Sequence, residues 1–68
     1  MNTVLRQERL KRKWTQEYVA KQIGVTKAAF QRIETGRRKP SYSVLVKLLN
    51  LFGYKDPQEL FKEAPETY

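Results

Sequence analysis

Most of the side chains in this sequence that could do chemistry are cations, and they are unevenly distributed. The chain has 14 Lys and Arg residues against 7 Asp and Glu residues, which gives a net charge of +7. Residues 1–39 hold eleven of the cations and three of the acids, a net charge of +8. Residues 40–68 hold three cations and four acids, a net charge of −1. This concentration of positive charge predicts a binding face for a polyanion.

Missing residue types exclude several other kinds of chemistry. The sequence has no Cys and no His, so it offers no disulfide, no thiolate or imidazole metal ligand, and no imidazole to act as a general base at neutral pH. Its acids form no paired-carboxylate constellation, although a carboxylate or lysine site stays possible. We therefore expect no enzyme activity, no metal and no cofactor.

The apolar segments indicate a cytoplasmic protein with no membrane partner. None approaches the ~20 residues of a membrane span, and the N-terminus lacks a hydrophobic signal core. A basic helix can also lie on a membrane surface, but only with a broad apolar face left free for lipid. Here we expect the apolar faces to be used in the core.

Apolar residues recur at helical spacing throughout, and no alternating strand run is present. We predict five helices, at residues 3–13, 15–23, 27–35 and 41–52 and from residue 56 onward. Side chains suited to N-caps mark the starts of four helices, at Thr15, Thr26, Ser41 and Asp56. Glycines mark the ends of three helices, at Gly24, Gly36 and Gly53. The prediction is one all-α domain at residues 1–64, followed by a short flexible tail at residues 65–68.

The inward positions of these helices define the expected core, with Trp14 as a large lid over it. The core residues we predict are Leu5, Leu10, Val19, Ala20, Ile23, Val25, Phe30, Ile33, Leu45, Leu48, Leu49, Phe52 and Leu60.

Residues 16–35 have the pattern of a helix-turn-helix. That motif needs a small residue where its two helices press together, a glycine to begin the turn, and apolar residues that hold the pair on the core. Ala20 and Gly24 supply the first two features, and Val25, Phe30 and Ile33 supply the third. A random helical hairpin would seldom match all five positions.

Over residues 4–61 the sequence resembles the helix-turn-helix family of the lambdoid phage repressors and Cro. The matching segments are Thr15-Gln16, Ala20 with Gly24, Ile33-Glu34-x-Gly36 and Arg38-Lys39-Pro40-Ser41. The resemblance implies a five-helix bundle with a central helix-turn-helix, in agreement with the helix count from periodicity. It also implies binding of double-stranded DNA, with the second helix of the motif in the major groove.

The resemblance assigns roles to the exposed cations and hydroxyls. On the second helix of the motif, the positions that match base-contacting ones are Lys27, Ala28 and Arg32, with Gln31 close by. Contacts to the phosphates are expected from Gln16, Thr26, Arg37, Arg38, Lys39, Ser41 and Tyr42. The plainer alternative is that these side chains form only a solvated helix face and a solvated loop.

Two further features are interpreted as structural. The run at residues 11–13 places cations at a helix C-terminus, where they complement the helix dipole. Arg9 and Glu34 occupy inward helical positions, and similar proteins have an ion pair at the matching positions. We therefore predict a partly buried Arg9–Glu34 pair that orients the second helix of the motif.

One such helix covers too few base pairs for useful specificity, so a homodimer on two half-sites is expected. The contact between the two subunits is predicted in the near-neutral half, at Leu51, Tyr54 and Phe61; the alternative is that these residues only complete the core.

The expected function is a transcriptional repressor without a small-molecule effector. An antitoxin, disfavoured by the short tail, and a protein-interaction module, disfavoured by the charge, are the alternatives.

Overall fold

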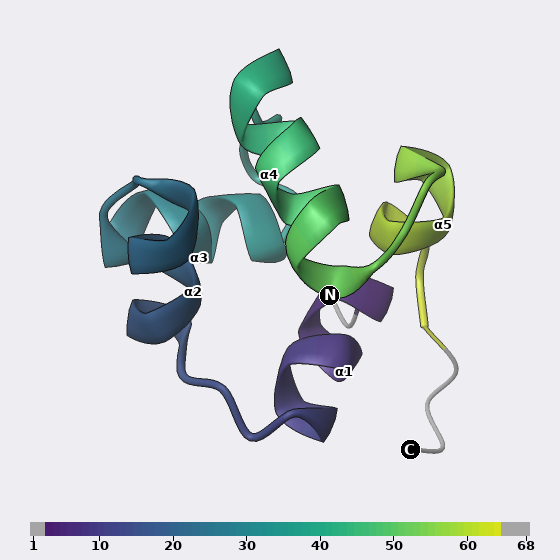
Figure 1. The fold of residues 1–68 in the computed structure, drawn as a ribbon, viewed down its shortest axis with the longest axis horizontal. Coiled ribbons are helices and arrows are strands. Elements are labelled where there is room, and N and C mark those ends of the chain that lie inside the picture. The colour runs from purple at the N-terminus through teal and green to yellow at the C-terminus, as the bar shows by residue number, and fades with distance from the viewer. Residues whose placement is uncertain (1–2, 65–68) are drawn as a thin grey trace.

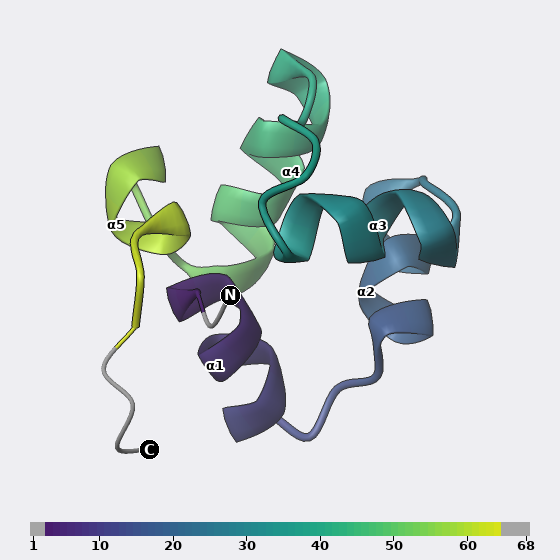
Figure 2. The same ribbon diagram turned by 180° about the vertical axis from the view of Figure 1, so that it is seen from behind.

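The computed structural model describes residues 3–64, and these form a five-helix all-α fold, as predicted. The helices are α1 Val4–Lys11, α2 Gln16–Ile23, α3 Lys27–Glu34, α4 Tyr42–Phe52 and α5 Pro57–Phe61. Helix α4 lies at the centre, with α2 and α3 on one side of it and α5 on the other, while α1 closes the base (Figures 1 and 2). The tail predicted at residues 65–68 lies outside the described residues.

Each helix begins at a side chain that caps it, because the first backbone N–H groups of a helix have no partner within the helix. In every case the side-chain oxygen accepts a hydrogen bond from a backbone N–H two or three residues further on, at Thr3, Thr15, Thr26, Ser41 and Asp56. The four predicted caps are thus confirmed. Helix α1 is shorter than predicted, since Thr3 is its cap and Lys11 its last residue.

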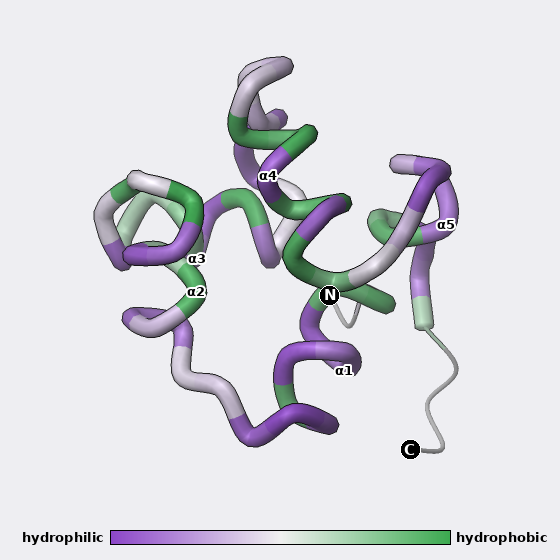
Figure 3. Tube along the Cα trace, in the orientation of Figure 1, coloured by the Kyte–Doolittle hydropathy of each residue, from purple (hydrophilic) through white to green (hydrophobic). Residues whose placement is uncertain are grey.

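The core is contributed by all five helices and contains ten apolar residues with at most 6% of their surface exposed. Figure 3 shows apolar residues interspersed among polar ones along the helices, in keeping with amphipathic helices that bury one face. The predicted residues found in this core are Leu5, Val19, Ala20, Ile23, Phe30, Ile33, Leu48, Phe52 and Leu60. Val25 and Leu49 are half-buried against it, and so is Trp14, as expected of a lid.

The prediction for Leu10 is wrong, because 38% of its surface is exposed. A helix turns about 100° per residue, so Leu5 and Arg9 share one side of α1 whereas Leu10 lies on a neighbouring side. The buried position is taken by the side chain of Arg9, which is 7% exposed.

The start of α1 is held in place by two distant segments. The hydroxyl of Thr3 donates to the backbone carbonyl of Glu34 at 3.3 Å, and the backbone N–H of Val4 donates to the carbonyl of Lys62 at 3.0 Å. These bonds attach α1 to the end of α3 and to the segment after α5.

No helix in the described part of the chain has the length and apolar character to cross a membrane.

Candidate nucleic-acid interface

The turn between α2 and α3 sets the geometry of the site. Gly24 ends α2 with φ = 75°, and the backbone N–H of Val25 donates to the carbonyl of Ala20 at 3.0 Å. A Cβ added at Gly24 would meet only the Lys47 ammonium, at 3.7 Å, so the left-handed backbone rather than crowding requires glycine here. Helix α3 then begins at its cap, Thr26.

Helix α3 has a buried side and an exposed cationic side. Phe30, Ile33 and Glu34 are buried. The four residues predicted to contact bases are all exposed: Lys27, Ala28, Gln31 and Arg32. Among the described residues no salt bridge engages either cation of this set. Their donors are therefore available to a ligand along one face of the helix.

The loop after α3 is tied to the end of that helix. The backbone N–H groups of Arg37 and Arg38 both donate to the carbonyl of Arg32, at 2.8 and 3.2 Å. The side chains of Arg37, Arg38 and Lys39 are exposed, as are those of Ser41 and Tyr42 at the start of α4. The predicted phosphate-binding residues of this loop therefore lie next to the C-terminal end of α3.

The remaining predicted phosphate contacts, Gln16 and Thr26, stand at the starts of α2 and α3. The hydroxyl of Thr26 accepts from the backbone N–H of Ala29 at 3.1 Å, which leaves its own proton free to donate. An open notch of about 470 Å³ lies between the two helix starts and is lined by Arg9, Thr15, Gln16, Glu17 and Lys27.

The predicted Arg9–Glu34 pair is present and buried. Arg9 Nε donates to Glu34 Oε2 at 2.7 Å and Arg9 Nη2 donates to Glu34 Oε1 at 3.2 Å, in a bidentate arrangement. Arg9 Nη1 also donates to the carbonyl of Trp14 at 2.8 Å. The pair therefore joins α1, the segment before α2, and the end of α3.

Sequence reasoning missed a second partner of Glu34. The side-chain amide of Gln16 donates from Nε2 to Glu34 Oε1 at 3.1 Å. Gln16 is therefore bonded within the chain, and its amide keeps one N–H and its oxygen for other contacts. Spacing gives no signal for this bond, because the two residues are 18 positions apart and meet only when α2 packs on α3.

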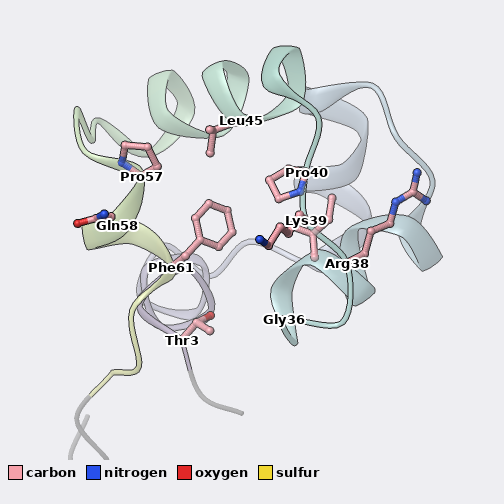
Figure 4. A pocket seen from close by; sticks show the side chains of 10 residues that line it. Thr3, Gly36, Arg38, Lys39, Pro40, Leu45, Pro57, Gln58 and Phe61 are labelled. Carbon is pink, nitrogen blue, oxygen red and sulfur yellow. The ribbon is translucent and has the colours of Figure 1, made fainter.

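The three residues predicted at a dimer contact all pack partly against the core. The Tyr54 hydroxyl donates to Glu8 Oε2 at 2.9 Å. Phe61 also faces a groove of about 500 Å³, which Leu45, Pro57 and the Lys39–Pro40 segment border (Figure 4). Leu51 and Tyr54 do not line this groove.

Two titratable groups near the C-terminal end of α4 have shifted pKa values, the Glu8 carboxyl and the Tyr54 hydroxyl. The hydrogen bond from Arg12 lowers the pKa of Glu8, against desolvation, which raises it. Burial raises the pKa of the Tyr54 hydroxyl, and its bond to Glu8 adds to this. Both groups lie outside the predicted DNA contacts, and Arg12 is used inside the fold, in keeping with the structural interpretation of that residue.

Comparison with known proteins gives one result. A search of curated proteins and a search of solved structures found no match. A helix-turn-helix family model matches residues 5–60, which include the whole of α2, the turn and α3. Because this match covers most of the chain, the protein belongs to the helix-turn-helix family of the Cro and phage-repressor type, whose members are DNA-binding regulators.

Proposed function

We propose that this protein is a transcriptional repressor that binds a palindromic operator in the cytoplasm as a homodimer. The single observation that carries the proposal is the exposed cationic side of α3, with Lys27, Gln31 and Arg32 free for a ligand and the Arg37–Lys39 loop beside it. The arrangement suits an α-helix that reads bases while its neighbours hold phosphates.

Selection of bound sequences from a random DNA pool tests the proposal directly. The expected result is a palindromic consensus with half-sites about one helical turn apart. With three or four cationic phosphate contacts per subunit, the slope of log K against log[salt] is about −5 to −7 for a dimer. A pool that yields no consensus, or a slope near zero, would instead favour a protein-interaction module on the same fold.

Two arginine variants distinguish residues that read bases from residues that bind phosphate. Arg32→Ala removes a side chain that can grip guanine O6 and N7, so it should cost about 1–3 kcal/mol on the consensus and relax preference at one base pair per half-site. Arg38→Ala should weaken binding to all sequences alike. Lys55→Ala, which removes an exposed cation from the near-neutral half, is the matched control and should change neither. Identical profiles for Arg32→Ala and Arg38→Ala would contradict this division.

For the dimer, we propose that the groove at Phe61 receives the second subunit, with Leu51 and Tyr54 contributing less. The groove is apolar at Pro40, Leu45 and Pro57, and its border includes Arg38 and Lys39. A partner seated there would stand next to the phosphate-binding loop, so both subunits could follow the same DNA backbone.

The dimer is tested by stoichiometry on one palindromic site, measured by native mass spectrometry. Leu45→Glu should abolish the two-subunit complex, because it places a charge in the apolar groove. Leu10→Glu is the matched control, since Leu10 is exposed and lies outside the groove. Selective binding of one wild-type subunit per duplex would exclude the dimer, and an unaffected Leu45→Glu would exclude the groove.

A further inference from the structure

The segment between α1 and α2 contains an unusual backbone conformation. Lys13 has φ = 58°, and within residues 3–64 it is the only residue other than glycine with a positive φ. Its backbone N–H donates to the carbonyl of Leu10 at 3.0 Å, and that of Trp14 donates to the carbonyl of Arg9 at 3.1 Å. This is the hydrogen-bond pattern of a Schellman helix end, in which the left-handed position normally belongs to glycine.

The other helix ends of this type in the described chain follow that preference. Gly24, Gly36 and Gly53 hold the corresponding positions after α2, α3 and α4, with φ between 75° and 81°. A side chain at a left-handed position brings Cβ too close to the backbone, so lysine is unfavourable there relative to glycine. Backbone geometry therefore gives no reason for lysine at position 13.

Packing gives no reason either. Lys13 is exposed, and none of the salt bridges or side-chain hydrogen bonds among residues 3–64 involves its ammonium. By contrast, the neighbouring Arg12 is engaged with Glu8 and with the carbonyl of Phe52. The Lys13 side chain thus contributes a free positive charge and little else.

The segment that carries Lys13 leads into the notch at the starts of α2 and α3. Thr15, two residues after Lys13, lines the notch, and so does Arg9, whose guanidinium holds the intervening Trp14 carbonyl at 2.8 Å. Lys27 lines the notch from α3. The segment with Lys13 therefore borders a surface that carries the Lys27 ammonium, the Glu17 carboxylate and the Arg9 guanidinium, which is paired with Glu34.

We propose that Lys13 is a further phosphate-contacting residue, retained in a conformation that favours glycine because its charge is used by DNA. The inference rests on the proposed function and adds a contact on the α1–α2 side of the notch. A purely structural lysine, placed there to complement the dipole of α1, would affect folding but not the dependence of DNA binding on salt.

Lys13→Gly tests the proposal because its two expected effects have opposite signs. Relief of the left-handed side chain should raise Tm by about 3 °C. Loss of one phosphate contact per subunit should make the salt slope of a dimer shallower by about 2 and weaken binding to the consensus. Lys13→Arg, which keeps the charge, should retain the wild-type slope, and Lys55→Gly serves as a control for an exposed lysine in the near-neutral half.

The outcomes are distinct from those that test the proposed function. If the wild-type protein binds its consensus and Lys13→Gly leaves both slope and affinity unchanged, the Lys13 contact is overturned and the repressor proposal stands. If the wild-type protein shows no sequence-selective, salt-dependent binding, the proposed function is overturned and this contact falls with it. A shallower slope in Lys13→Gly but not in Lys13→Arg or Lys55→Gly supports the contact.

Discussion

Helix α1 carries two arginine–glutamate pairs whose surroundings differ. Arg9 and Glu34 are buried, with side chains 9% and 1% exposed, and the pair joins residues 25 positions apart. Arg12 and Glu8 are 31% and 18% exposed and lie one helical turn apart. The same two residue types therefore serve in one place as a link between helices and in the other as a local surface contact.

The two pairs also recruit different neighbours. Glu34 receives Arg9 and Gln16, so the buried pair connects the predicted phosphate contact at α2 to the end of α3. The guanidinium carbon of Arg12 lies 5.5 Å from the ring centre of Trp14 and 5.2 Å from that of Phe52, and Arg12 donates to the Phe52 carbonyl at 3.2 Å. The buried pair thus fixes the end of α3, the helix predicted to contact bases, whereas the outer pair covers the ring of Trp14.

The largest expected effect is from breaking the buried pair. Arg9→Ala leaves the Glu34 carboxylate buried without its cation, so it should destabilise the fold by about 3–5 kcal/mol. A domain of this size has on the order of 3–10 kcal/mol in total, so the variant should be largely unfolded at 37 °C. Circular dichroism on urea titration measures the change, with the exposed Lys11→Ala as the control. A loss below 1 kcal/mol would contradict the role given to burial.

Replacing both partners sharpens the same point. In Arg9→Met with Glu34→Leu no buried charge is left alone, so the double variant should be more stable than either single variant and within about 2 kcal/mol of the wild type. A double-mutant cycle from urea unfolding gives the coupling between the two residues. Additive losses would show that packing, rather than charge compensation, dominates at this position.

The helices could be predicted from the sequence because their signals are local. Apolar spacing, an N-cap at each start and glycine at three ends are all read within a few residues, and the structure confirms them. The prediction that Leu10 is buried is wrong because its neighbour Arg9, a cation, takes the buried position. Spacing alone does not show that an inward arginine will find a carboxylate 25 residues away; the resemblance supplied that pairing.

Contacts among distant segments were less predictable. The groove at Phe61 is assembled from the loop after α3, from α4 and from α5, and no single segment indicates it. The bond of Gln16 to Glu34 depends on the crossing of α2 and α3. Exposure of the four predicted base contacts on α3 could be inferred from helical periodicity.

A smaller effect is expected at the outer pair. Arg12→Ala removes a partly exposed salt bridge, contacts with two rings and hydrogen bonds to two carbonyls, and should cost about 1–2 kcal/mol. Trp14 fluorescence should report a more solvated ring in the folded variant, because Arg12 covers it. Arg12→Lys keeps the charge without the planar fork and should recover only part of the loss. A loss equal to that of Arg9→Ala would remove the distinction between the two pairs.

The smallest effect concerns how stability at the outer pair depends on pH. The pKa of Glu8 is lowered in the folded state, first by the hydrogen bond from Arg12. Its contribution to stability is therefore present above the ordinary glutamate pKa and is lost as pH falls through the lowered value. The pKa of Tyr54 is raised, first by burial and then by its bond to Glu8. Its contribution is present below the ordinary tyrosine pKa near 10 and is lost as pH rises through the raised value.

Tyr54→Phe separates the two contributions, because it removes the hydroxyl that donates to Glu8 while leaving Arg12 in place. The Glu8 pKa, followed by NMR titration of its carboxyl carbon, should rise toward its ordinary value but stay below it. The loss of stability in alkaline solution should become smaller. Tyr42→Phe is the matched control, since Tyr42 is 82% exposed and should leave both pH dependences unchanged. An unchanged Glu8 titration in Tyr54→Phe would mean that the Tyr54 hydroxyl does not contribute to the lowered pKa of this carboxylate.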